Sequence, residues 1–132
     1  MIAIRKIEPP VWIDPPIPTD REGVSRHRIY QPGDAWYASL VDGSWLMFAD
    51  GPYRDPLTLA PEHAGKRPII VVLPRHGGAF CVHSPVMREG VYGSHGWKVD
   101  GDLENLSIFS VFPSIDMRAI WHGHLLNGQL TP

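Results

Sequence analysis

The stretch Pro68-Ile69-Ile70-Val71-Val72-Leu73 is a continuous run of apolar residues, most of them β-branched. Such a run predicts a strand that is buried on both faces, because a half-exposed strand would alternate apolar with polar residues. The glycine-containing segment 75–78 follows it and predicts a turn into a second strand over 79–83. The fold is therefore expected to be built around a central strand at 68–73.

Two dipeptides outside this run are typical of tight hairpin turns. Asp42-Gly43 and Asn127-Gly128 both favour a type I′ turn between antiparallel strands. Short segments with turn signals between them complete a set of about nine expected strands. Besides the two strands above, the expected strands are 26–30, 35–41, 44–49, 97–100, 106–112, 119–126 and 129–131, and the segment 60–64 is the one place where a helical turn is expected.

The composition agrees with an all-β chain. The 132 residues include 14 prolines and 13 glycines, which leave little room for long helices. Several short strands joined by turns predict a mainly β fold, either a small antiparallel sandwich or a partly open barrel. Residues 1–132 are expected to form a single domain.

Residues 1–20 are expected to form an extended, proline-rich arm. Five prolines fall between Pro9 and Pro18, so this segment is predicted to lie near the polyproline II conformation. Trp12 and Ile13 are its apolar anchors. The arm is expected to lie across its own domain or, alternatively, to clasp a neighbouring subunit in a homo-oligomer.

Charge and composition argue against several classes of partner. The net charge is −2 and the sequence pI is about 6.4, whereas a nucleic-acid-binding domain is normally basic. The longest apolar run is too short to cross a bilayer, and the first residues lack the apolar region of a signal peptide. Cys81 is the single cysteine, which fits a reducing compartment. A cytoplasmic protein, without nucleic-acid or membrane partners, is predicted.

Seven histidines and Cys81 raise the question of a metal site. His76, Cys81 and His83 lie close in sequence, and a zinc ion could take them with one further imidazole. The candidates for that fourth ligand are His95, His122 and His124. Their spacing matches no zinc motif, so no metal or other cofactor is predicted, and a zinc site is kept as an alternative.

Ser114 and His122 are candidates for a catalytic pair. Eight residues separate them, a spacing that suits neighbouring strands of a hairpin. Cβ atoms opposite each other on such strands are about 5 Å apart, and a serine becomes a nucleophile when an adjacent imidazole takes its proton. The acid that would orient the imidazole is left open between Asp116, Asp100 and Glu104. The competing interpretation is a turn serine and exposed histidines on a sheet face.

Much of the segment 68–132 resembles a family of small, largely uncharacterised phage and bacterial β-proteins. That family is related to peptidase-like proteins of bacterial ubiquitin-like conjugation operons. The motifs that carry the resemblance are Trp97-Lys98-Val99, Asn105-Leu106-Ser107-Ile108, Pro113-Ser114-Ile115, Trp121-His122-Gly123-His124-Leu125 and Asn127-Gly128-Gln129-Leu130.

The resemblance implies a Ser/His hydrolase with Ser114 as nucleophile and His122 as base. It would act on peptide or acyl-peptide bonds, in the host cytoplasm if it is phage-encoded, and Trp97, Trp121 and His124 would contact the substrate. The alternative from another class is a non-enzymatic β module that binds a protein partner. Its sequence support is the proline-rich arm together with five tryptophans.

Overall fold

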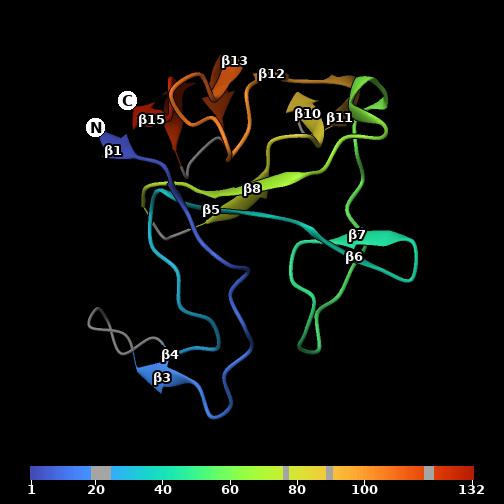
Figure 1. Cartoon of the computed structure of the whole chain (residues 1–132), viewed down its shortest axis with the longest axis vertical. Coiled ribbons are helices and arrows are strands. Elements are labelled where there is room, and N and C mark those ends of the chain that lie inside the picture. Colours follow the sequence, from blue (N-terminus) through green and yellow to red (C-terminus); the bar gives the residue numbers. More distant parts are fainter. Residues whose placement is uncertain (19–24, 76–77, 89–90, 118–120) are drawn as a thin grey trace.

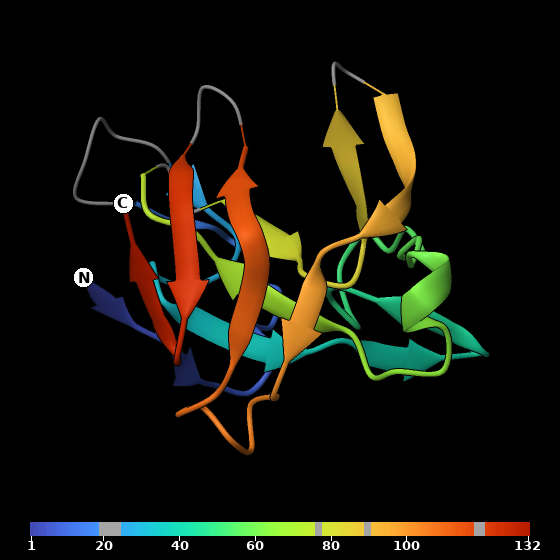
Figure 2. The same ribbon diagram turned by 90° about the horizontal axis from the view of Figure 1, so that it is seen from above.

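The computed structural model describes residues 1–18, 25–75, 78–88, 91–117 and 121–132. The chain is mainly β, with 42% of residues in strands and 3% in helix, which confirms the predicted class. Its sheets are antiparallel for the most part, and none of those described closes into a barrel. The two largest sheets face each other, and their strands cross at a steep angle (Figures 1 and 2).

The larger sheet has five strands in the order β1-β15-β14-β13-β12, all pairing antiparallel. Four of its strands come from the last third of the chain, and β1 joins them from the N-terminus. Their bounds are β1 Ile2–Ala3, β12 Lys98–Asp100, β13 Ser110–Asp116, β14 His122–Leu126 and β15 Gln129–Thr131.

The second sheet has four strands in the order β2-β5-β8-β9. β8, Ile69–Val72, lies inside it and is buried on both faces, as the apolar run predicts. Its neighbours β5, Asp34–Tyr37, and β9, Ala79–Cys81, pair with it antiparallel. β2, Arg5–Lys6, pairs parallel with β5 at one edge, so β9 forms the other edge.

Three two-stranded hairpins and one 3-10 turn complete the described elements. The bounds are β3 Ile17–Pro18 with β4 Ser25–Arg26, β6 Ser39–Val41 with β7 Ser44–Leu46, β10 Pro85–Arg88 with β11 Val91–Gly96, and the 3-10 turn η1 Pro61–His63. Both predicted tight turns are present, since Asp42 and Gly43 have φ values of 50° and 81°, and Asn127 and Gly128 have 51° and 74°. The β10–β11 hairpin was not predicted.

Two hydrophobic cores lie on the two faces of the four-stranded sheet. The main core fills the space between the two large sheets and includes Val71, Phe109, Val111, Ile115 and Leu125. The second core lies on the opposite face, and its fully enclosed members are Trp36, Ile70, Val72 and Cys81. Alternate residues of β8 thus enter different cores, which explains why a polar residue is missing from 68–73.

Several predicted strands have different bounds in the structure, and the strand expected at 119–126 begins on residues outside the described ranges. The segment expected at 106–112 begins with turns, because Leu106 O accepts the N–H of Phe109, and the strand runs instead from Ser110 to Asp116. The segment expected at 35–41 is interrupted at Ala38, whose N–H donates to Pro68 O. Of 26–30, only Arg26 belongs to a strand.

The N-terminal residues belong partly to the sheets rather than to a separate arm. β1 and β2 pair with different sheets, and the buried Ile4 between them donates its N–H to Gly128 O. The proline-rich part then follows without regular strands until β3. The predicted extended arm is therefore shorter than residues 1–20, because its first six residues complete two sheet edges.

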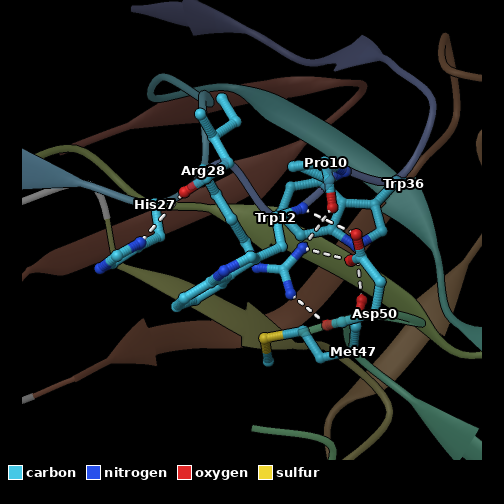
Figure 3. A network of polar contacts seen from close by, with 8 residues as sticks. Pro10, Trp12, His27, Arg28, Trp36, Met47 and Asp50 are labelled. Carbon is cyan, nitrogen blue, oxygen red and sulfur yellow. Dashed lines mark hydrogen bonds and ion pairs between the residues drawn. The ribbon is translucent and has the colours of Figure 1, made fainter. Parts of the chain in front are cut away.

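The proline-rich segment docks on its own domain through Arg28 (Figure 3). The guanidinium of Arg28, which is 8% exposed, donates to Pro10 O at 2.6 Å and to Asp50 Oδ1 at 2.8 Å. The other carboxylate oxygen of Asp50 accepts the N–H of Trp12 at 2.8 Å. Trp12 is half-buried and stacks on His27 with ring centroids 4.0 Å apart.

Candidate functional site

Ser114 and His122 lie on adjacent antiparallel strands, β13 and β14, as predicted. Both side chains are on the outward face of the five-stranded sheet, because Ile115 between Ser114 and Asp116 is fully buried. The register places His122 directly opposite Asp116, and Ser114 is diagonal to that pair. Diagonal neighbours are separated by about 7–8 Å between Cα atoms.

No hydrogen bond joins Ser114 to His122 among the residues that the structure describes. His122 is exposed, and the four hollows described for this chain are lined by neither residue. The pair therefore shares a sheet face and borders none of the four hollows described for this chain. Its catalytic role stays a prediction.

The three residues predicted to contact a substrate occupy different environments. Trp97 is buried, and its indole donates to the backbone oxygen of Ser114 at 3.3 Å. Trp121 is also buried, as part of the main core. His124 is exposed on β14, on the same face as His122. Only Trp97 among them lines one of the four hollows described for this chain.

The structure does not bring together those metal candidates that fall within its described ranges. Cys81 belongs to the second core, where burial raises the pKa of its thiol. His83 uses its Nδ1 atom to accept the N–H of Ile69 at 3.2 Å. His95 is exposed near Glu62, and His76 lies outside the described residues. Within the described ranges, no group of three His, Cys, Asp or Glu residues could hold a metal ion.

One hollow lies beside β9, the strand at one edge of the four-stranded sheet. It has a volume of about 270 Å³ and is bordered by all three residues of β9. Most of its walls are apolar side chains that come from five different parts of the chain. The main apolar contributors are Met47, Leu57, Phe80, Trp97 and Met117.

Some backbone groups of β9 point toward this edge, and three of them have no hydrogen-bond partner among the described residues. Val82 donates its N–H to Ile69 O, and Leu73 donates to Gly78 O. With the register of the two strands, this means that every second residue, Gly78, Phe80 and Val82, is hydrogen-bonded to β8. In an antiparallel ladder the residues between such pairs direct their N–H and C=O groups away from the partner strand. Here those residues are Ala79 and Cys81.

Three outward backbone groups are left open within the described part of the chain. Cys81 O accepts the N–H of Ser84 at 3.3 Å in the turn that follows β9. The N–H and C=O groups of Ala79 and the N–H of Cys81 have no such partner. A sheet edge with open donors and acceptors is a template for pairing with another extended segment.

Sequence reasoning did not find this edge or a buried histidine pair close to it. His63 and His83 are 2% and 4% exposed, and their ring centroids are 4.7 Å apart. Twenty residues separate them in sequence, with no motif to link them. Only the chain path, which folds η1 against the turn after β9, brings the two rings together.

Comparisons with known proteins yield no relative. No family model matches the chain, and neither a curated protein nor a solved structure matches it. The resemblance of 68–132 to a phage and bacterial family stays a prediction. Among the described residues, the structure contains no helix of the length and apolarity needed to traverse a membrane.

Proposed function

We propose that this chain is a non-enzymatic β module that binds an extended segment of a protein partner along β9. The observation that carries the proposal is the coincidence of open backbone groups on Ala79 and Cys81 with an apolar hollow of about 270 Å³. Main-chain hydrogen bonds to an edge strand supply affinity, and a side-chain pocket supplies selectivity.

The chemistry of the hollow defines the expected segment. A paired peptide strand directs alternate side chains to the same face, so one or two of them would enter the hollow. Aromatic and thioether side chains from Phe80, Trp97 and Met117 border it, and these favour an aliphatic or aromatic anchor. The expected ligand is a short extended peptide with an apolar residue between polar ones.

Selection from a displayed library of random decapeptides tests this proposal. The blocked variant is Ala79→Pro, which removes an outward N–H and places a ring on the free edge without deleting a hydrogen bond to β8. The matched control is Leu40→Glu, which changes an exposed apolar side chain on the separate β6–β7 hairpin.

We expect enriched peptides with alternating apolar residues that bind the parent and Leu40→Glu equally. Binding to Ala79→Pro should fall at least about tenfold, the equivalent of losing one to two net hydrogen bonds. Thermal melting of each variant verifies folding, and Leu57→Lys provides a second block within the hollow. Peptides that bind Ala79→Pro as well as the parent would refute the proposal.

A second candidate function is the Ser/His hydrolase acting on peptide or acyl-peptide bonds. The observation that favours it is that Asp116 faces His122 directly across the strands, where an orienting acid would be needed, with Ser114 on the same face. Labelling by a fluorophosphonate probe tests it, with Ser107→Ala as the matched control for Ser114→Ala. Labelling that Ser114→Ala leaves unchanged removes this candidate.

A further inference from the structure

A separate hollow of about 420 Å³ lies between the end of β5, the segment before β8 and the loop after β12. Its polar lining includes hydrogen-bond donors, two cations and two carboxylates. The residues that matter are Tyr37, Lys66, Arg67, His83, Asp102 and Glu104.

His83 supplies a hydrogen-bond donor, and the tautomer of its ring is determined by a backbone hydrogen bond. Its Nδ1 atom accepts the N–H of Ile69 at 3.2 Å, so in the neutral ring the proton is on Nε2. The side chain is 4% exposed and lines the hollow. Among the described residues no acceptor bonds to this Nε2–H. The Nε2 atom is not fully buried, so a ligand could reach it.

Tyr37 supplies a second, nearly buried donor. Its hydroxyl oxygen accepts the N–H of Leu103 at 3.2 Å, which leaves the hydroxyl proton free to donate. Leu103 lies between Asp102 and Glu104, which both line the hollow. The hydroxyl group of Tyr37, which bonds to Leu103, is therefore close to these lining residues. The residue is 9% exposed, and no acceptor for its proton is present in the described ranges.

Two cations lie beside these donors without an ion-pair partner. Arg67 places its guanidinium 3.9 Å from the centroid of the Tyr37 ring, and neither Arg67 nor Lys66 forms an ion pair with any residue that the structure describes. The pKa of His83 is lowered mainly by burial, and the charge of Lys66 adds a smaller contribution.

The two carboxylates of the hollow already have partners. Glu104 Oε1 accepts from Lys6 Nζ at 2.7 Å, and Asp102 Oδ1 accepts the N–H of Glu104 at 2.9 Å. The nearly buried groups of the hollow that have no partner among the described residues are both donors, the Nε2–H of His83 and the hydroxyl of Tyr37. Beside them lie the exposed cations Lys66 and Arg67, and an acceptor that carries negative charge could pair with all four groups.

We propose that this hollow binds the oxyanion group of a small ligand, a carboxylate or a phosphate, through Lys66, Arg67, the Nε2–H of His83 and the hydroxyl of Tyr37. Such a group would satisfy both buried donors and neutralise the two cations. The site is distinct from the β9 edge and does not depend on the proposed function.

NMR of the His83 ring tests the proposal, because this residue lines the hollow and its Nε2–H has no acceptor among the described residues. The parent protein is titrated at pH 7 with sodium phosphate and, separately, with sodium acetate, at ionic strength held constant with sodium chloride. We expect a saturable change in the His83 ring signals with at least one of the two anions. The stronger of the two identifies the oxyanion class.

Two variants and one control give the result its specificity. Lys66→Met should weaken binding about tenfold, as expected for the loss of one charge-assisted hydrogen bond, and Tyr37→Phe should weaken it while keeping the ring beneath Arg67. Lys98→Met removes an exposed lysine on β12 outside this hollow and should change nothing. No saturable response to either anion, or equal responses of the parent and Lys66→Met, would overturn the proposal.

Discussion

The imidazoles of His63 and His83 meet edge to face in the protein interior, with an interplanar angle of 86°. His63 Nε2 donates to Trp97 O at 2.6 Å, so its Nδ1 atom carries no proton in the neutral ring and is buried with no partner among the described residues. His83 in turn accepts a backbone N–H. A nitrogen that accepts an N–H carries no proton, so the His83 ring is neutral in this arrangement.

The buried His83 ring should make the fold sensitive to mild acid. Burial lowers the pKa of His83 to about 4, with further contributions from His63 and Lys66. Because the unfolded chain takes up this proton near the ordinary value of 6.5, stability is fully present above that pH and falls as the pH drops toward 4. The expected loss in the free energy of unfolding is about 3 kcal/mol, measured by urea denaturation across this range.

Two variants separate this effect from general acid denaturation. His83→Gln cannot take up a proton, so its free energy of unfolding should change less between pH 6.5 and 4, whatever its value at neutral pH. His124→Gln changes an exposed imidazole on the sheet surface and should keep the slope of the parent. A slope in His83→Gln as steep as that of the parent would show that other groups cause the acid sensitivity.

Arg28→Met should release the proline-rich segment. The substitution keeps an apolar stem but leaves the backbone oxygens of Pro10 and Asp50 without their donor. It also removes a cation that lies 4.0 Å from the centroid of Phe48. We expect a loss of about 2–4 kcal/mol in the free energy of unfolding, because one side of a buried polar network is removed.

Limited proteolysis distinguishes local release of the segment from general destabilisation. Cleavage within residues 7–16 should accelerate in Arg28→Met under conditions in which the rest of the chain stays intact. The matched control is Arg26→Met, since among the described residues the guanidinium of Arg26 makes only a distant ring contact, 5.9 Å from the centroid of Tyr30. Equal cleavage in both variants would show that Arg28 does not hold the segment.

The sequence predicted those parts of the fold that depend on local patterns. The run at 68–73 indicated a doubly buried strand because it lacks polar residues, and each hairpin dipeptide has the positive φ values that asparagine, aspartate and glycine tolerate. The β10–β11 hairpin and the pairing of residues 2–6 were missed. Segments of two to six residues take their structure from tertiary partners, which local propensity does not encode.

The site was harder to predict for a related reason. The spacing of Ser114 and His122 correctly placed them on adjacent strands. Their register, however, depends on an irregularity between Val111 and Ile115 that the residue pattern does not predict. The edge of β9 is open because no described strand pairs with its outer side, which is a matter of tertiary arrangement. Its residues, Ala79 to Cys81, read as an ordinary apolar strand.

Metal removal should leave the protein unchanged. The histidines and Cys81 within the described ranges form no three-ligand group, and the Nδ1 atom of His83 already has a partner. We expect well under one equivalent of zinc by elemental analysis of untagged protein, and no change in Tm on adding a chelator. Stoichiometric zinc that is lost in His83→Gln would contradict this and favour the zinc alternative.

The two hairpin glycines offer a matched pair in which backbone strain and steric collision can be separated. Gly43 and Gly128 both follow a residue with positive φ and have φ values of 81° and 74°, so alanine is strained at either position. A methyl group on Gly43 would meet no atom within 4 Å, whereas one on Gly128 would collide with the carbonyl oxygen of Leu106. Gly43→Ala should therefore cost about 1 kcal/mol in the free energy of unfolding and Gly128→Ala about 2–4 kcal/mol, measured by urea denaturation. Equal losses would mean that the Leu106 segment moves aside without cost, and that strain alone determines both values.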